Sequence, residues 1–265
     1  MAEILGIKID SLGIQEAIKN AHNFLYNGKH NVIFTPNPEM LVDAQSDSYF
    51  KKVLNSSNLN ISDGFGVSLV TFGRIKRLPG IDFVYELLKL AQKENKSVYL
   101  LGSASKKVLE KAVENIKKDF PKLRVVGFDP GPKIDFLMVD DKKTIITERE
   151  ENDKVLHDII MTAPDILLVG FGHNKQEKWI SENMADLPSV KIFMGVGGSF
   201  DFIAGFDYSG KEVKRAPCFL RKIGLEWVYR LVIQPWRLRR ILKALIQFPI
   251  CVILNQVVSH QKKGW

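Results

Sequence analysis

Residues 164–201 read PDILLVGFGHNKQEKWISENMADLPSVKIFMGVGGSFD. Two short apolar runs, Asp165–Gly170 and Lys191–Gly195, enclose a stretch with helical periodicity over Gln176–Asp186. A strand, a helix and a second strand in this order form a βαβ unit, in which the two strands lie parallel in one sheet. The segment therefore predicts an α/β fold with a mainly parallel sheet.

The same alternation extends back through the first 210 residues. Further strands are predicted at Asn31–Thr35, Ser97–Leu101 and Arg124–Phe128, and an apolar run also ends at Ile61. Stretches with helical periodicity separate them, at Ile14–Tyr26, Glu39–Asn55, Phe83–Glu94, Lys106–Phe120 and Lys154–Thr162. The highly charged segment Asp129–Asp153 does not fit this pattern, and we expect it to be irregular.

The charge is divided unevenly along the chain. The 265 residues carry a net charge of +8, yet residues 1–210 have 26 basic and 28 acidic side chains. Residues 211–265 have twelve basic side chains and only two acidic ones, Glu212 and Glu226. We therefore expect two units, residues 1–210 and 211–265, of which the second binds a polyanion such as a nucleic acid, an anionic membrane or a phosphate group.

The basic tail also has an amphipathic, aromatic character. Ala244–Leu254 is apolar except for Gln247, which is too short a run to cross a bilayer but is typical of a helix that lies on a membrane surface. Pro235 and Pro249 are expected to break the tail into separate helical pieces. A helix that packs in a dimer or against the core, with a solvated basic face, is the alternative.

The chain carries neither a disulfide framework nor a recognisable targeting segment. Its two cysteines, Cys218 and Cys251, favour a reducing compartment. The first ten residues mix charged with apolar side chains, unlike a signal peptide. These features predict a cytoplasmic protein.

In a parallel α/β sheet, ligands bind beyond the carboxyl ends of the strands, so the loops that follow the apolar runs are the candidate site. Asp63 follows one such run between Ser62 and Gly64, where a carboxylate could act as a general base. Asp201 follows another and could contact a nucleotide ribose. Each of these aspartates could instead cap a helix N-terminus.

Other kinds of site find little support. The five histidines show no metal-binding spacing, and the sequence has no dinucleotide fingerprint and no nucleophile elbow. We expect no hydrolytic triad, no obligatory metal and no nicotinamide cofactor. In the tail, Arg230, Arg237 and Arg240 would lie within about 80° of one another on a helix and could hold a diphosphate. A solvated basic face is the alternative explanation of that spacing.

Eight short motifs occur in a characteristic order: Thr35-Pro-Asn-Pro-Glu39, Ser62-Asp63-Gly64, Leu78-Pro79-Gly80-Ile81-Asp82, Pro164-Asp165-Ile-Leu, Lys175-Gln176-Glu177-Lys178-Trp179, Gly195-Val-Gly-Gly-Ser-Phe-Asp201-Phe-Ile-Ala-Gly205, Lys214-Arg215-Ala216-Pro217 and Gly224-Leu225-Glu226-Trp227. With these motifs, from about Ile4 to Arg240, the chain resembles the WecG/TagA/CpsF glycosyltransferase family.

The resemblance implies a Rossmann-like α/β fold with helices on both faces of the sheet, followed by a C-terminal appendage that packs over the site at the membrane. It implies an inverting transfer of N-acetylmannosamine, or a related sugar, from a UDP-sugar to polyprenyl-diphosphate-linked N-acetylglucosamine in cell-wall or surface-polysaccharide biosynthesis. No cofactor or metal is implied. The protein would act in the cytoplasm, on the inner face of the cell membrane.

The resemblance also implies roles for individual residues. Asp63 is the candidate catalytic base that deprotonates the acceptor hydroxyl. The candidate substrate-binding residues are Thr35, Asn37, Gln176, Asp201, Arg230, Arg237 and Arg240, the arginines gripping the lipid diphosphate.

Departures from the family pattern, such as His173-Asn174 after Gly172, leave the donor sugar open. N-acetylmannosaminuronic acid and glucose-type donors are alternatives, and a homo-oligomer is an alternative to a monomer. Two other classes remain as alternatives. The tail could bind nucleic acid, although its long aliphatic runs and the lack of a recognised motif argue against this. It could also be buried between the subunits of a protein without catalytic activity.

Overall fold

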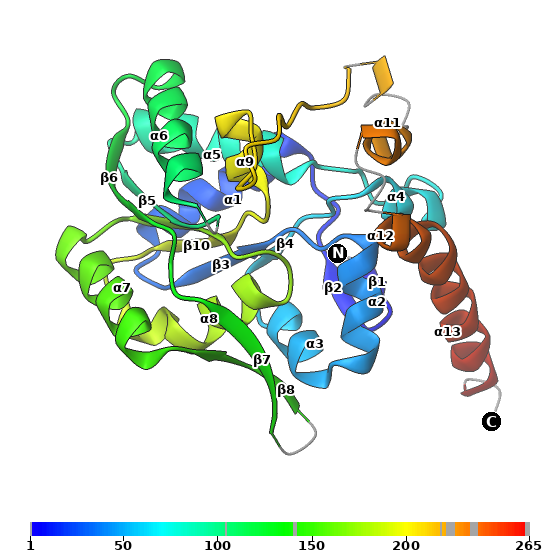
Figure 1. Ribbon diagram of the computed structural model, residues 1–265. Coiled ribbons are helices and arrows are strands. Elements are labelled where there is room, and N and C mark those ends of the chain that lie inside the picture. Colours follow the sequence, from blue (N-terminus) through cyan, green and yellow to red (C-terminus); the bar gives the residue numbers. More distant parts are fainter. Residues whose placement is uncertain are drawn as a thin grey trace.

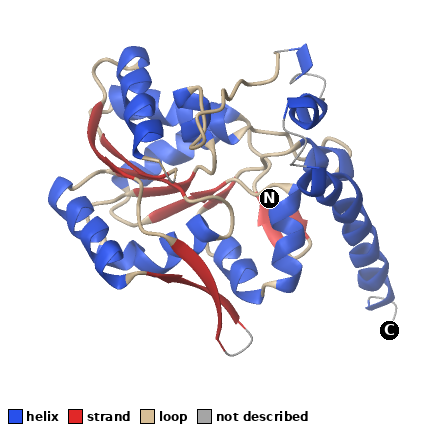
Figure 2. Ribbon diagram, in the orientation of Figure 1, coloured by secondary structure: helices blue, strands red, loops and turns tan. Residues whose placement is uncertain are grey.

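The computed structural model describes residues 2–103, 105–139, 142–217, 219–220, 226–233 and 238–262. Its centre is a six-stranded sheet in which every neighbouring pair of strands is parallel, in the order β4-β3-β10-β9-β5-β6 (Figures 1 and 2). The strands of this sheet are β3 (Asn31–Phe34), β4 (Leu59–Asn60), β5 (Ser97–Gly102), β6 (Arg124–Asp129), β9 (Ile166–Gly170) and β10 (Ile192–Gly195). The predicted α/β class and the predicted strands are confirmed.

Helices cover both faces of the sheet (Figure 1). One face carries α1 (Ile14–Tyr26), α5 (Gly80–Lys93), α6 (Lys106–Asp119) and α9 (Ser199–Ala204). The other carries α2 (Pro38–Ser46), α3 (Ser48–Asn55), α7 (Arg149–Thr162) and α8 (Lys175–Asn183), which continues as the 3₁₀ helix η1 (Met184–Asp186). The predicted fold is therefore confirmed.

The central strands are apolar throughout because both of their faces are buried. In β9, for example, Ile166 and Leu168 join the hydrophobic cluster under α1, α5 and α6, whereas Leu167 and Val169 join the cluster under α2, α3 and α8. Side chains alternate between the two faces along each strand, so a single run of aliphatic residues supplies two cores.

The segment that was expected to be irregular is ordered. Within Asp129–Asp153, β7 (Ile134–Val139) and β8 (Lys142–Thr147) form an antiparallel hairpin that projects away from the central sheet (Figure 1). Helix α7 begins at Arg149, five residues before the predicted start. Among the described residues of the hairpin, only Ile134 and Ile145 are buried, so its strands show no regular buried face. The prediction was wrong because the charged runs Asp140–Lys143 and Glu148–Asp153 then dominated the pattern.

Two smaller features also differ from the expectation. Residues 2–9 form a hairpin, β1 (Ala2–Ile4) and β2 (Ile7–Ile9), that was not predicted. The single helix predicted over Glu39–Asn55 is two helices, α2 and α3, separated at Asp47. The Asp47 side chain accepts a hydrogen bond from the Phe50 N–H at 2.9 Å, so this residue caps a new helix instead of continuing the old one.

The basic tail is helical over its described residues 226–233 and 238–262. The tail contains α11 (Glu226–Ile233), α12 (Leu238–Leu242), the π-helical turn η3 (Lys243–Gln247) and α13 (Phe248–Lys262). Helix α4 (Phe65–Val70) of the core contacts α13. Residues 238–262 are helical without interruption, so the expectation that Pro249 separates two helices was wrong. Pro249 follows the π-helical turn, a local rearrangement that accommodates a residue without an N–H. Pro235 lies outside the described residues.

Candidate functional site

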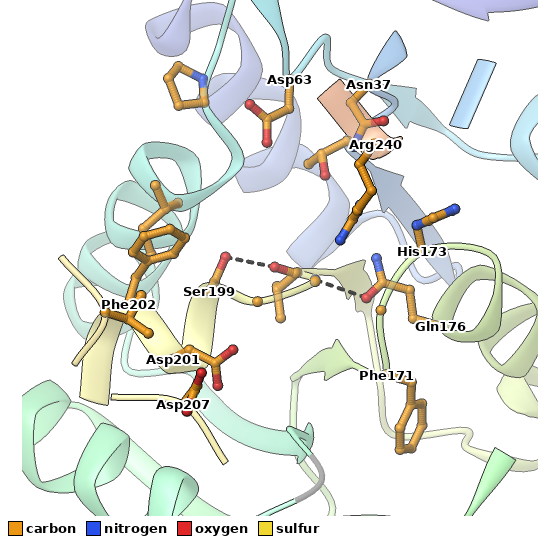
Figure 3. A pocket seen from close by; sticks show the side chains of 18 of the residues that line it. Asn37, Asp63, Phe171, His173, Gln176, Ser199, Asp201, Phe202, Asp207 and Arg240 are labelled. Atoms are coloured by element: carbon orange, nitrogen blue, oxygen red, sulfur yellow. Dashed lines mark hydrogen bonds between the residues drawn. The ribbon is translucent and has the colours of Figure 1, made fainter. Parts of the chain in front are cut away.

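A cavity of about 740 Å³ lies at the carboxyl ends of β3, β4, β9 and β10 (Figure 3). It brings together six of the eight predicted site residues, which come from segments far apart in the sequence: Thr35, Asn37, Asp63, Gln176, Asp201 and Arg240. Of the remaining two, Arg230 lies in α11, and Arg237 lies outside the described residues. The strand-end loops thus form one cleft, as the parallel sheet predicts.

Asp63 stands between β4 and α4 and points into this cavity (Figure 3). Its N–H donates to the Pro36 carbonyl at 3.0 Å, which ties the Asp63 loop to the loop after β3. The N-cap of α4 is Gly64, so the alternative that Asp63 caps this helix was wrong. Gly64 has a φ of +151° and packs closely on Pro38, a conformation and a contact that require glycine.

The Asp63 carboxylate and the Thr35 hydroxyl both face the first residue of α5. A Cβ built on Gly80 would lie 3.5 Å from Asp63 Oδ2 and 3.5 Å from Thr35 Oγ1. An acid and a hydroxyl from the loops that follow two different strands therefore converge beside a residue without a side chain. Such a place can bring a hydroxyl group of a ligand within reach of a carboxylate that could act as a general base.

Asn37 lines the cavity and also has a structural role. It is the N-cap of α2, and its Oδ1 accepts a hydrogen bond from the Met40 N–H at 3.0 Å. Pro38 follows as the first residue of the helix, a position where the missing N–H has no cost. This cap holds the Asn37 side chain at the edge of the cavity.

Gln176 is almost fully buried and spans two segments of the site. Its Oε1 accepts a hydrogen bond from the Gly197 N–H at 2.9 Å, and its Nε2 donates to Glu177 Oε1 at 2.7 Å. A Cβ on Gly195 would lie 2.7 Å from Gln176 Nε2, so the amide has room only because residue 195 is glycine. The loop after β10 is thereby fixed to the start of α8.

Glu177 supports the site from behind the cavity wall, and the sequence analysis did not single it out. It is completely buried behind Gln176, and its Oε2 atom has no hydrogen-bond partner among the residues that the structure describes. Burial raises the pKa of this carboxyl to about 7, against the opposing effect of the hydrogen bond from Gln176. Its signal in the sequence is a charged residue directly after Gln176 on a helix that packs against the core.

Asp201 lies in the first turn of α9, on another side of the cavity (Figure 3). The N-cap of α9 is Gly198, so the capping alternative for Asp201 was also wrong. The Ser103 hydroxyl donates to Asp201 Oδ1 at 3.4 Å. A second cavity of about 670 Å³ adjoins the first and shares Lys175, Asp201 and Arg240 with it, and its wall adds Lys133.

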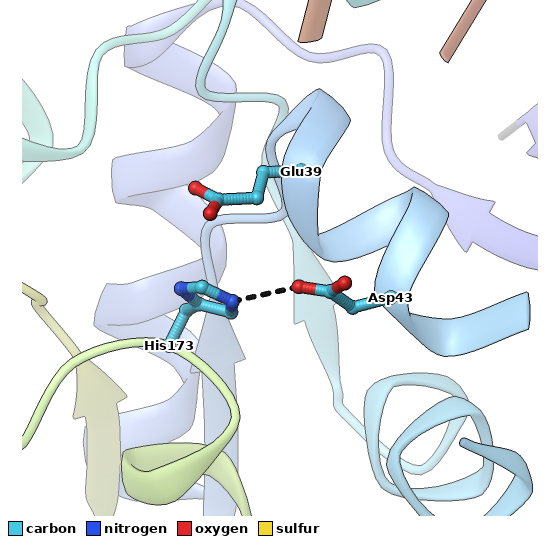
Figure 4. Close-up of side chains that lie close together, drawn as sticks. All are labelled: Glu39, Asp43 and His173. Atoms are coloured by element: carbon cyan, nitrogen blue, oxygen red, sulfur yellow. Dashed lines mark hydrogen bonds and ion pairs between the residues drawn. The ribbon is translucent and has the colours of Figure 1, made fainter. Parts of the chain in front are cut away.

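Arg240 reaches the cavity from the C-terminal helices and is held by an ion pair. Its Nε lies 2.8 Å from Glu39 Oε2, and its terminal nitrogen lies 2.7 Å from the same oxygen. One turn further along α2, Asp43 pairs with Lys243 of η3 and with His173, whose Nε2 lies 2.9 Å from Asp43 Oδ2 (Figure 4). Acids of the core therefore bind cations of the tail directly beside the site.

These charges also bear on metal binding. Among the residues that the structure describes, Glu39, Asp43 and His173 form a group of possible metal ligands. Their ligand atoms lie within 4.8 Å of one another. Burial acts to raise the pKa of Asp43, but hydrogen bonds from His173 and Lys243 outweigh it and hold that pKa below the usual value. Because Arg240 and Lys243 already neutralise the two carboxylates, the cluster is better suited to joining two parts of the chain than to holding a cation.

Comparisons with known proteins match nearly the whole chain. The model of the glycosyl transferase WecG/TagA/CpsF family matches residues 2–263. An N-acetylglucosaminyldiphosphoundecaprenol N-acetyl-beta-D-mannosaminyltransferase of Bacillus subtilis strain 168 is 35% identical over 215 residues, which is 80% of this chain and 75% of the relative. Proteins of the same name are 33% identical in Bacillus spizizenii (90% and 83% covered) and 30% identical in Staphylococcus aureus strain NCTC 8325 (90% and 87% covered).

Proposed function

Because the chain belongs to the WecG/TagA/CpsF glycosyltransferase family, we propose that it transfers N-acetylmannosamine from UDP to N-acetylglucosamine linked through a diphosphate to undecaprenol. The donor sugar and the acceptor come from the names of the relatives, and the UDP carrier from the family resemblance. The observation that carries the proposal is the cavity in which a carboxylate, an amide and an arginine meet at the strand ends.

Asp63 is the proposed general base. Its carboxylate takes the proton of an acceptor hydroxyl, and the oxygen then attacks the anomeric carbon of the donor sugar. The bond from that carbon to the UDP oxygen breaks on the opposite face, so the configuration inverts, and UDP leaves with the electron pair. A single base is sufficient because the leaving diphosphate needs charge stabilisation more than it needs a proton.

The two adjoining cavities offer such stabilisation. Lys133, Lys175 and Arg240 line them, together with the backbone of Gly198. Asp201 stands between the cavities, where it could accept hydrogen bonds from a ribose. We assign the UDP moiety to this side and the acceptor sugar to the side of Asp63 and Thr35.

We further propose that residues 211–265 are an appendage that attaches the catalytic core to the cytoplasmic face of an anionic membrane. The support is an exposed apolar stripe on the C-terminal helices, whose side chains are 44–60% exposed: Leu242, Ile246, Ile250, Ile253 and Leu254. Phe248, on the other side of the helix, is fully buried in the core. Among the described residues, no helix is both long and apolar enough to span a bilayer.

The activity can be tested with a panel of UDP-sugars and a short-chain, water-soluble lipid-diphosphate N-acetylglucosamine acceptor, with product masses as the readout. We expect a disaccharide product with N-acetylmannosamine as the added sugar. A product with only a uronic acid or a glucose-type sugar would replace the proposed donor, and no product with any UDP-sugar would contradict the proposed activity.

The assignment of the base is tested by Asp63→Asn, which should bind UDP normally but turn over roughly 10²–10⁴-fold more slowly, the usual effect of losing a general base. The matched control is Asp186→Asn, an exposed carboxylate in η1 outside the cavity wall. Near-normal turnover by Asp63→Asn would remove this residue from the mechanism.

A further inference from the structure

The segment that follows Asp63 presents an aromatic side chain to solvent in an unusual way. Helix α4 ends at Val70, and Phe72 in the turn behind it is 93% exposed. Its φ is +51°, in the left-handed region that bulky residues rarely adopt because it strains their backbone. Both the exposure and the backbone conformation are unfavourable for an isolated protein in water, so the turn calls for an explanation outside the folded chain.

The turn is well ordered by its own hydrogen bonds. The Gly73 N–H donates to the Ser68 carbonyl at 2.8 Å, and the Arg74 N–H donates to the Thr71 carbonyl at 3.0 Å. The Thr71 hydroxyl donates to the Val67 carbonyl at 2.8 Å. Val67 before the turn and Ile75 after it are buried in the core. Phe72 is therefore held outward by a fixed turn.

The surroundings of Phe72 match a membrane surface. Leu69 is 56% exposed, and Arg74 and Lys76, on the other side of Phe72, are exposed as well. Apolar side chains beside cations are the composition with which peripheral proteins bind an anionic bilayer. The basic composition of residues 211–265 favours the same partner.

The turn also lies next to the proposed membrane appendage. Helix α4 contacts α13, and a Cβ on Gly66 would lie 3.5 Å from the Ala244 carbonyl oxygen of η3. Figure 1 shows α4 beside α12, at the end of the molecule where α13 begins. Helix α4, which leads directly into the Phe72 turn, thus packs against the proposed appendage.

We propose that residues 69–76, the Phe72 turn, form a second membrane contact that belongs to the catalytic core and not to the appendage. Phe72 and Leu69 enter the boundary between headgroups and acyl chains, and Arg74 and Lys76 contact anionic headgroups. The inference rests on the proposed function in one respect, because the lipid-linked acceptor is what brings the enzyme to a bilayer.

The position of the turn in the chain gives this contact a purpose. Asp63 precedes it, and Arg77 and Pro79 follow it, and all three line the cavity. The segment that touches the bilayer is therefore anchored at both ends in the site wall. Contact with the membrane would place the opening of the site at the depth of the acceptor headgroup.

The test compares Phe72→Ser with a matched control, Met161→Ser, which alters a 71% exposed apolar side chain on α7. Binding is measured by co-sedimentation with vesicles of phosphatidylcholine, with and without phosphatidylglycerol. We expect Phe72→Ser to lower the affinity for the anionic vesicles about tenfold or more, and Met161→Ser to leave it unchanged.

Turnover separates this inference from the proposed function. Phe72→Ser should lose turnover of a long-chain acceptor embedded in anionic vesicles and match the wild type on the short-chain soluble acceptor. The inference would be overturned if Phe72→Ser bound vesicles as well as the wild type does. If the same variant also changed from an oligomer to a monomer, the turn would instead contact a second copy of the chain. If the wild-type protein fails to turn over the soluble acceptor, the proposed function fails, while the binding comparison still decides the role of Phe72.

Discussion

Glu177 is completely buried, and its pKa of about 7 lies well above the 4.5 of an ordinary glutamate. Between these two pH values the folded protein holds a proton that the unfolded chain has released, so the stability of the fold decreases as the pH rises. The total loss is on the order of 3 kcal/mol and is complete above about pH 7.

We predict that Glu177→Gln removes this pH dependence, because glutamine is isosteric and does not ionise. Urea unfolding at about pH 5 and about pH 7.5 measures it: relative to the variant, the wild type should lose stability at the higher pH. Parallel stability profiles for the two proteins would show that Glu177 keeps an ordinary pKa.

Gly195 offers a second prediction for a single residue. A Cβ at this position would lie 2.7 Å from Gln176 Nε2, so Gly195→Ala should displace the Gln176 amide and, with it, the Gly197 N–H that the amide holds. We expect a loss of turnover of at least about tenfold, since a small displacement in an active site has a large effect on rate. Gly13→Ala is the control, because a Cβ there would meet only the Glu16 carboxylate, at 4.0 Å. Equal turnover by both variants would mean that Gln176 does not need its present position.

At the scale of secondary-structure elements, the boundary between α2 and α3 depends on a buried ion pair. Asp47 Oδ2 lies 2.7 Å from Lys178 Nζ, and both side chains are almost completely buried. Asp47→Ala should destabilise the protein by about 3–5 kcal/mol, because it removes the cap of α3 and leaves the Lys178 charge buried without its partner. Urea unfolding measures the change in the free energy of unfolding.

Two comparisons sharpen this prediction. Glu150→Ala breaks the exposed pair with Lys154 on α7 and should change stability by no more than about 1 kcal/mol. The double variant Asp47→Ala/Lys178→Met should recover part of the loss, because the buried charge has gone. If the double variant lost as much free energy of unfolding as the two single variants lose together, the pairing would be contradicted.

The ion pair also shows why this boundary was missed in the sequence. Asp47 and Lys178 are 131 residues apart in the sequence, so the periodicity of Glu39–Asn55 does not indicate that Asp47 has this partner. The central strands, by contrast, were predicted within a residue or two, because burial on both faces makes them continuous aliphatic runs. The β7–β8 hairpin lacks that burial, and its exposed Asp135 and Lys142 resemble the charged residues of a solvated loop.

The candidate site likewise has one part that the sequence predicts and another that it does not. Asp63, Gln176 and Asp201 could be placed together in advance, because parallel strands bring the residues at their carboxyl ends to one edge of the sheet. The ion pair between Arg240 and Glu39 could not, since it depends on how the C-terminal helices pack against α2. Local patterns predict which elements form, whereas contacts between distant elements need the structure.

At the scale of the whole molecule, the C-terminal helices have two different faces. Phe248 is buried in the core, and Arg240 and Lys243 pair with acids of α2, so one side holds the appendage against the catalytic core. The other side exposes Ile250 and Ile253. Deleting residues 222–265 should release the protein from membranes and abolish turnover of lipid acceptors, but it would also uncover the core that Phe248 covers. Substitutions on the exposed side therefore test membrane attachment more cleanly.

We predict that Ile250→Glu/Ile253→Glu leaves the fold intact and lowers binding to anionic vesicles by at least about a hundredfold, because two apolar side chains no longer enter the bilayer and two negative charges are added next to it. Co-sedimentation at low and at high salt measures this, and the remaining binding should be the more sensitive to salt. Ile160→Glu/Met161→Glu makes the same change on the exposed side of α7 and should bind vesicles almost as the wild type does. If both double variants lose binding equally, general charge repulsion and not the appendage face would account for the loss, and the proposed attachment through these helices would be wrong.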